Sequence, residues 1–139
     1  MDSICIYSGE VDINDIHDLR QHTEHALKQR GLDDDTCANL VLVVEEWISN
    51  IVNYAYQGKK GELELEVDVN DNQARVCIRD QGPEFNITSV KAIQIKDVNS
   101  PDAKPGGLGI ELIRRLVDDL DYSRSEDGWN QSCFRRNIQ

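Results

Sequence analysis

The chain has 139 residues, of which 26 are acidic and 15 basic, and its formal net charge is −11. This length is typical of one domain and can bury a core without disulfides or a structural metal. The acidic excess disfavours binding to nucleic acid and to anionic membranes, because both depend on basic contacts. No apolar run approaches the roughly 20 residues of a membrane span, and the first residues lack the features of a secretory signal, so we expect a cytoplasmic protein.

The charge is unevenly distributed along the chain. Residues 1–85 hold 18 acidic and 7 basic side chains, whereas residues 86–139 hold eight of each. A phosphorylated ligand would therefore not be held by a large basic patch. Backbone N–H groups and a metal ion would have to bind it instead.

The first part of the sequence predicts a short strand followed by two helices. The strand is expected at residues 4–7. The first helix is expected to extend from a cap at Asp12 or Asn14 to about Arg30. The second helix is expected at residues 33–56, where three aspartates at its start suit the positive end of the helix dipole.

The second helix carries two stripes of different character. Its apolar stripe is expected to face the core and comprises Cys37, Leu40, Val41, Val44, Ile48, Ile51, Val52 and Ala55. On the opposite side, Glu46, Asn50 and Asn53 form a polar stripe. A polar stripe of this kind normally faces solvent. Its apolar neighbours, which include Trp47, favour a pocket instead.

The remainder of the chain predicts two hairpins, a loop and a third helix: strands 62–69 and 74–79, loop 86–105, helix 109–120, and strands 121–127 and 131–138. Strands and helices do not alternate one for one. We therefore expect an α+β domain over residues 1–139, a two-layer sandwich with a mainly antiparallel sheet and helices packed on one face. A loop as long as 86–105 inside such a domain is often a functional lid.

The four cysteines are far apart in the sequence. Cys5, Cys37, Cys77 and Cys133 form neither a C-x-x-C pair nor a zinc-binding spacing. We interpret all four as reduced packing residues of a cytosolic protein.

Three segments carry residues suited to chemistry. Glu46 and Asn50 are four residues apart, which places a carboxylate and an amide on one helix face. An amide oxygen suits Mg²⁺, and a carboxylate one turn away can accept a proton from a nucleophile. By itself this spacing occurs by chance in many helices.

The second segment, residues 80–85, follows a buried strand and begins with Asp80-Gln81-Gly82-Pro83. Asp80 can accept the amino proton of adenine, and Gly82 allows close approach of the backbone. An Asp-Gly turn is the simpler interpretation of this segment alone. The third segment, Pro105-Gly106-Gly107-Leu108-Gly109-Ile110, is a glycine-rich loop that enters a helix, whose free N–H groups can bind anionic oxygens; a flexible turn is the alternative.

In this order, the three segments resemble the N, G1 and G2 boxes of the ATPase superfamily that DNA gyrase, heat-shock chaperones and sensor histidine kinases share. The match is closest to the small bacterial anti-sigma-factor serine kinases. The N box is Glu46-x-x-x-Asn50 with Ala55-Tyr56, the G1 box is residues 78–85, and the G2 box is residues 106–118. The resemblance covers nearly the whole chain and places the short ATP lid at residues 86–105. It implies the Bergerat-type ATP-binding fold.

The resemblance also implies roles for individual residues. Asn50 would bind the Mg²⁺ that bridges the ATP phosphates, and Glu46 would be the general base toward a serine or threonine hydroxyl. Asp80 would bind the adenine amine, and Gly82 would line the base pocket. The phosphates would lie on the G2 loop, and Ser132 would lie near adenine; the loop residues are Gly106, Gly107, Leu108 and Gly109.

One position departs from the family pattern. The family often has a histidine four residues after the asparagine, and Tyr54 stands there in this chain. The adjacent Asn53 is polar and could replace it in phosphate contacts.

The family phosphorylates a small serine-bearing protein, the anti-sigma-factor antagonist. Many members also bind a sigma factor and form homodimers. The resemblance thus implies an ATP- and Mg²⁺-dependent serine/threonine kinase in a partner switch. The alternative is a binding module in which ATP controls partner affinity with little or no phosphoryl transfer. Glu46 favours the kinase, since a pure binder needs no base, whereas Tyr54 favours the binder.

Overall fold

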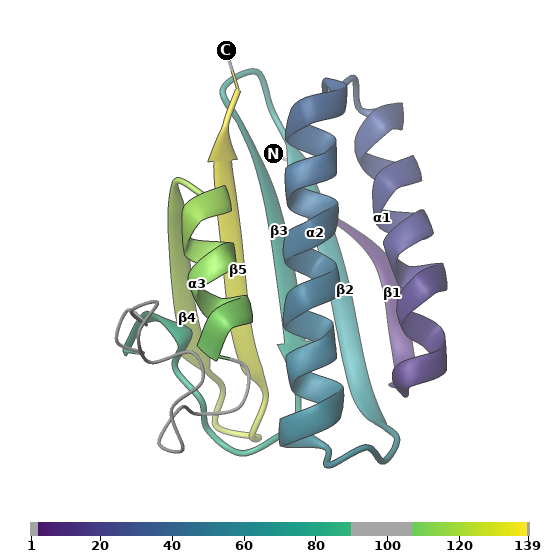
Figure 1. Cartoon of the computed structure of the whole chain (residues 1–139), viewed down its shortest axis with the longest axis vertical. Helices are drawn as coiled ribbons and strands as arrows, with labels where there is room; N and C mark the ends of the chain where they lie inside the picture. Colours follow the sequence, from purple (N-terminus) through teal and green to yellow (C-terminus); the bar gives the residue numbers. More distant parts are fainter. Residues whose placement is uncertain (1–2, 90–106, 139) are drawn as a thin grey trace.

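The computed structural model describes residues 3–89 and 107–138 of the chain, and residues 1–2, 90–106 and 139 are not described. Five strands form one sheet, in which every neighbouring pair is antiparallel: β1 (Ile4–Val11), β2 (Gly61–Val69), β3 (Gln73–Asp80), β4 (Asp119–Arg124) and β5 (Asn130–Asn137). Their order across the sheet is β1-β2-β3-β5-β4. The three helices α1 (Ile16–Gln29), α2 (Asp34–Asn50) and α3 (Gly107–Leu116) lie on one face of this sheet (Figure 1). The predicted α+β class, with a mainly antiparallel sheet and helices on one face, is confirmed.

Two aspartates begin the first two helical segments, as their positions in the sequence predict. Asp12 accepts a hydrogen bond from the backbone N–H of Asn14 and caps a 3₁₀ turn, Ile13–Asp15, that leads into α1. Asp33 accepts from the backbone N–H of Thr36 at 3.0 Å and caps α2. Each carboxylate satisfies an N–H group that has no partner inside its helix.

The second helix does not continue in one form to Tyr56. The α-helix ends at Asn50, and Ile51–Ala55 form one π-helical turn, in which the Tyr56 N–H donates to the Ile51 carbonyl at 2.9 Å. A π turn takes more residues per revolution than an α turn, so side chains after Asn50 are rotated away from their expected positions.

The third helix also ends earlier than its pattern suggests. It is predicted to reach Leu120, but it ends at Leu116, because Leu120 pairs with Phe134 in the last hairpin. The backbone N–H of Asp118 already donates to the Arg135 carbonyl at 2.8 Å. Sheet hydrogen bonds thus replace the final helical turn, and the side chain of Leu120 still packs against the core.

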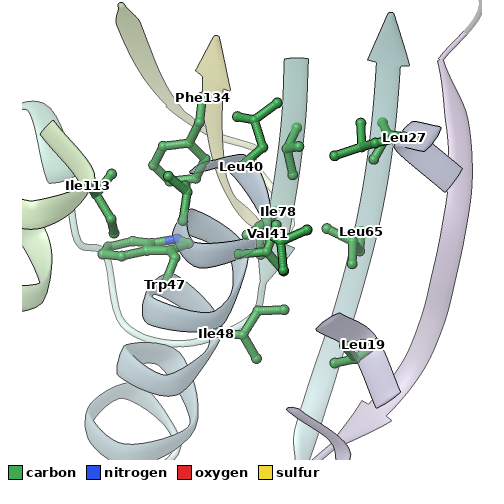
Figure 2. Close-up of a cluster of buried hydrophobic side chains, with 14 of the residues drawn as sticks. Leu19, Leu27, Leu40, Val41, Trp47, Ile48, Leu65, Ile78, Ile113 and Phe134 are labelled. Atoms are coloured by element: carbon green, nitrogen blue, oxygen red, sulfur yellow. The ribbon is translucent and has the colours of Figure 1, made fainter. Parts of the chain in front are cut away.

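The core lies between the sheet and the three helices. Alternate residues of β2 and β3 are fully buried, and the apolar stripe of α2 packs against them. In Figure 2, the side chains of Ile113 of α3 and Phe134 of β5 lie above the ring of Trp47 of α2. The rings of Trp47 and Phe134 are 6.1 Å apart in an edge-on arrangement, which aromatic pairs prefer. Among the helices of the described residues, none is long and apolar enough to cross a membrane.

The other face of the sheet carries charged side chains. Arg79 pairs with Glu64 at 3.1 Å, and Arg75 pairs with Asp68 at 3.6 Å, because each pair lies directly opposite on adjacent strands. Between these pairs, Cys77 of β3 and Cys133 of β5 form a disulfide. The prediction that all four cysteines are reduced is therefore wrong for these two.

The sequence spacing cannot reveal that disulfide, because it arises from strand register. Cys77 and Cys133 are 56 residues apart but lie directly opposite each other on neighbouring antiparallel strands. Their Cα atoms are 4.1 Å apart. Cys5 and Cys37 remain free thiols.

Candidate functional site

A cavity of about 180 Å³ lies beside the C-terminal end of α2. Its walls are largely apolar and come from α2, the π turn, the segment after β3 and the start of α3; they include Trp47, Ile51, Ala55, Phe85 and Ile110. The polar side chains at its lining are Asn50, Tyr54, Asp80, Glu84 and Asn130. An apolar cavity with a few polar groups is typical of a small-molecule site.

Asp80 is the buried acid of this cavity, with 4% of its surface exposed. Its Oδ1 accepts hydrogen bonds from the Gly82 N–H at 2.8 Å and from the Asn130 amide at 3.0 Å. Burial raises the pKa of the Asp80 carboxyl above its ordinary value, and these two hydrogen bonds and the Arg124 charge oppose the rise. The side chain is therefore held by the protein in one orientation before any ligand binds.

Gly82 is required by a close approach. A Cβ added there would lie 2.7 Å from the Ala55 Cβ and 3.0 Å from the Asp80 Oδ1. Real Cβ atoms essentially never come that close, so the π turn and the segment after β3 can pack together only with glycine at this position.

Tyr56 joins the same segments from the other side. Its hydroxyl accepts a hydrogen bond from the Gln81 N–H at 2.8 Å and donates to the Glu62 carbonyl. Burial raises the pKa of this hydroxyl to about 12. Its ring also lies so close to Gly61 that a Cβ there would overlap it. The residues predicted as the N and G1 boxes are thus in direct contact.

Glu46 and Asn50 meet α3 beside the cavity, which Asn50 lines and Glu46 does not. A Cβ on Gly109 would lie 2.8 Å from the Glu46 Oε2 and 3.6 Å from the Asn50 Nδ2. The predicted N and G2 boxes therefore lie against each other, and glycine at residue 109 leaves room for the carboxylate. The Asn50 Nδ2 is buried and has no hydrogen-bond partner among the described residues.

The π turn separates Asn53 from this group. Asn53 is exposed, and its amide donates to the Ser49 hydroxyl at 3.2 Å rather than lining the cavity. Tyr54 lines the cavity instead, although 51% of its surface is exposed. Helical periodicity places Asn53 beside Asn50 only if the α-helix continues, and here it does not.

Only part of the glycine-rich segment can be placed. Gly107 and Leu108 lie in the first turn of α3, and Gly109 follows in the same helix. Gly106 and residues 90–105 of the predicted lid lie outside the described residues. Of the lid, Asn86 and the 3₁₀ turn Ile87–Ser89 are described, and Ile87 is fully buried.

Comparison with known proteins shows which family has this architecture. The profile of the histidine kinase-like ATPase domain matches residues 10–134, which is most of the chain. The chain belongs to the histidine kinase-like ATPase family. It is 27% identical over 99 residues to the serine-protein kinases RsbW of Bacillus mycoides (strain KBAB4) and of Bacillus cereus (strain G9842). These alignments cover 69% of the chain but 62% of each relative, so the chain spans less than two thirds of their length.

Solved structures show the same fold at lower identity. A chain of the SiaB–SiaC complex from Pseudomonas aeruginosa has a TM-score of 0.67 at 14% identity, covering 94% of this chain and 89% of that one. The mycobacterial sensor histidine kinase MprB has a TM-score of 0.51, also at 14% identity, covering 94% and 97%. The five-stranded antiparallel sheet with helices on one face is thus the histidine kinase-like ATPase fold.

In this ATPase domain, the residue that the sequence pattern missed is Asn130. Ser132 was expected near the base, but it is buried opposite Ile78 and does not line the cavity. Asn130 lies directly opposite Asp80, lines the cavity and donates to the Asp80 carboxylate. The sequence pattern starts the last strand at residue 131, whereas β5 begins at Asn130, so the pattern does not reveal Asn130 as a partner of Asp80.

The site residues of this ATPase domain suit a nucleotide with its metal ion. The apolar walls around Asp80 fit a flat base that carries one hydrogen-bond donor. Within the described residues, the Asn50 amide forms no hydrogen bond and the Glu46 carboxylate forms neither a hydrogen bond nor an ion pair, and hard oxygen ligands of this kind are the ones that Mg²⁺ binds. Mg²⁺ takes few protein ligands and retains water and phosphate oxygens, which agrees with a site that offers one amide.

Proposed function

We propose that this protein is an ATP- and Mg²⁺-dependent serine/threonine kinase of a partner switch, which phosphorylates a small antagonist protein and acts as an anti-sigma regulatory factor. The observation that carries the proposal is the meeting of Glu46, Asn50 and Gly109 beside a cavity that Asn50 and Asp80 both line. A largely apolar cavity therefore adjoins a carboxylate, an amide and the first turns of α3. Similarity to the serine-protein kinases RsbW supports the same reaction class.

Each group has a role in this proposal. Asp80 accepts a hydrogen bond from the adenine amine, and Trp47 and Ile51 pack against the base. Asn50 would hold Mg²⁺, which would neutralise charge on the phosphates and orient them. The backbone N–H groups at the start of α3 bind phosphate oxygens, and so does Gly106 of the predicted loop.

Glu46 acts as the general base. Its carboxylate accepts the proton of the substrate serine hydroxyl as the serine oxygen bonds to the γ-phosphorus. The bond between that phosphorus and the bridging oxygen breaks, and ADP leaves with the electron pair. The half-buried position of Glu46 beside Gly109 supports this role, because no described residue forms an ion pair or hydrogen bond with its carboxylate.

The partner is expected to be a small domain with a target serine, and a sigma factor is a second expected partner. The RsbW relatives support this expectation, as does a fold neighbour taken from the SiaB–SiaC complex. A homodimer is a further expectation from the family.

The kinase proposal is tested by incubating the full chain with γ-labelled ATP, Mg²⁺ and the antagonist-like protein encoded nearest to it. Label on a serine of the antagonist is the expected result. The matched control is Glu46→Gln, which should bind ATP without transferring label. ATP binding without any transfer by the native chain would contradict the kinase proposal.

One observation favours a second function, an ATP-gated binding module with little phosphoryl transfer. Tyr54 lines the cavity where the family often has a histidine, and Asn53 points away from it. A phenol makes fewer contacts to phosphate than a positively charged imidazole. In this second function, ATP would change the affinity for the partner. The label-transfer experiment would then give no phosphoserine, although a binding measurement would still detect ATP.

A further inference from the structure

Three neighbouring strands bring one polar row to the base end of the cavity. Asp80 of β3 lies directly opposite Asn130 of β5, and Asn130 lies directly opposite Arg124 of β4. The row therefore runs from a carboxylate through an amide to a guanidinium. Asn130 is the buried centre of the row, with 3% of its surface exposed.

The contacts of Asn130 determine the orientation of its amide. Its Oδ1 accepts from the Arg124 guanidinium at 2.8 Å and from the Tyr122 hydroxyl. An arginine can only donate, so the amide oxygen must face it and the amide nitrogen must face the other way. The nitrogen then shares its two hydrogens among three acceptors, the Asp80 Oδ1 at 3.0 Å, the Gly82 carbonyl at 3.0 Å and the Pro83 carbonyl at 3.1 Å.

This orientation leaves Asp80 with one open oxygen. Both hydrogen bonds to the carboxylate, from Asn130 and from the Gly82 N–H, end on Oδ1. Within the described part of the chain, Oδ2 accepts no hydrogen bond, and Asp80 lines the cavity. A ligand therefore meets a bare acceptor at Oδ2.

The same amide also removes competing acceptors. The carbonyls of Gly82 and Pro83 both accept from Asn130, and the Gly82 carbonyl accepts from Arg124 as well, at 3.3 Å. These carbonyls are thus occupied and held in place. The hydrogen bonds of Asn130 also favour the ionised form of Asp80, against the rise in its pKa that burial causes.

We propose that Asn130 is a positioning residue that sets the base selectivity of this site. Locked by Arg124 and Tyr122, it presents Asp80 Oδ2 as the acceptor for a 6-amino purine and disfavours a 6-oxo purine, whose carbonyl oxygen would face a carboxylate oxygen. The inference rests on the proposed nucleotide site and deepens it, because the selectivity depends on three residues outside the predicted motifs.

The test compares the dissociation constants of ATP and ITP, each with Mg²⁺, measured by isothermal titration calorimetry on the full chain. ITP carries a carbonyl where ATP carries the amine and is otherwise closely matched. The native chain should bind ATP at least about tenfold more tightly than ITP, the usual worth of one buried hydrogen bond to a charged group. Asn130→Leu should bring the ratio close to one.

A second pair of variants tests the locking contacts without touching the buried amide. Arg124→Met combined with Tyr122→Phe frees the Asn130 amide to rotate and should lower the ATP to ITP preference by about tenfold. Arg124→Lys alone keeps a donor-only group at that place and should retain the preference. Asn137→Ala, an amide removed from the exposed end of the same strand, is the control for general effects on β5.

The outcomes distinguish a failure of the proposed function from a failure of the role proposed for Asn130. A native chain that binds neither nucleotide would overturn the proposed function together with this inference. A native chain that prefers ATP, with the preference unchanged in both Asn130→Leu and the Arg124/Tyr122 double variant, would overturn the inference alone. If Asn130→Leu does not fold, the double variant and Arg124→Lys decide the result by themselves.

Discussion

The two ends of the cavity are built in different ways. At the base end, Asp80, Gly82 and Asn130 are joined by hydrogen bonds within the protein. At the other end, Asn50 lines the cavity and lies with Glu46 against Gly109, and its buried Nδ2 has no hydrogen-bond partner among the described residues. Buried polar groups are normally satisfied, so groups left without partners indicate a place that a ligand completes. Under the proposed function, the fold preorganises base recognition, whereas the end near Glu46 and Asn50 would be completed by phosphate and metal.

The largest expected effect comes from a substitution at the end with Glu46 and Asn50. Glu46→Gln keeps the size of the side chain but removes the proton acceptor. Phosphoryl transfer should fall by about 10²–10⁴-fold, while the dissociation constant for ATP changes little, because recognition lies at the other end. Transfer rates with γ-labelled ATP and calorimetric binding measure both quantities. An unchanged transfer rate would remove Glu46 from the role of base.

The next effect tests how far the disulfide between β3 and β5 stabilises the sheet that carries the base end. Cys77 and Cys133 join β3 to β5, three residues from Asp80 and three from Asn130. Reduction should lower the free energy of unfolding by about 2–4 kcal/mol, measured by urea denaturation with and without a reductant. A Cys77→Ala/Cys133→Ala variant should be insensitive to the reductant, whereas Cys5→Ser should behave like the native chain. Equal stability in both conditions would show that the disulfide does not hold the strands.

A smaller effect is expected at the contact of Glu46 and Asn50 with α3. Gly109→Ala places a methyl group 2.8 Å from the Glu46 Oε2, so the carboxylate must move. Because a flexible side chain can yield, we expect little change in melting temperature but a loss of transfer of about tenfold, below the roughly 100-fold that a 1 Å misplacement can cost. The same substitution in a Glu46→Ala background should cause no further loss, since the two changes act through one contact. An additive loss would contradict the contact.

The smallest expected effect on stability is the pH dependence that Asp80 causes at the base end. Since burial raises the pKa of Asp80, its contribution to stability is present below the unfolded pKa of about 3.9 and is lost as pH rises through the folded pKa. Asp80→Asn stays neutral, so its stability relative to the native chain should increase as pH is raised from about 3 to neutral. Urea denaturation at several pH values measures this. A constant difference across that range would contradict it.

The same variant should alter base preference in a defined direction. With Asn at residue 80, the side-chain oxygen would accept from Gly82 and Asn130, which turns the NH₂ group toward the ligand. That donor opposes the amine of ATP and matches the carbonyl of ITP. We therefore expect weaker ATP binding and a shift toward ITP, and an unchanged ATP dissociation constant would contradict the role of Asp80 in binding adenine.

The contrast between the two ends also explains which features the sequence could predict. The helix carrying Glu46 and Asn50, the strand ending at Asp80 and the helix starting near Gly109 follow from periodicity and from glycine and aspartate signals in neighbouring residues. Asn53 was expected beside Asn50, and its outward direction results from the π turn, which no local signal marked. Asn130 and the disulfide depend on the register between strands that are about 50 residues apart.

Local patterns in the sequence therefore determined the class of fold, the order of its elements and the three segments that meet at the cavity, because helix faces and strand alternation depend on residues a few positions apart. Only the tertiary structure decided the partner of Asp80, the pairing of Cys77 with Cys133 and the exchange of Asn53 for Tyr54 at the cavity. Each of these depends on how distant strands align or on where packing changes the helical turn. Both are properties of the whole fold rather than of any one segment.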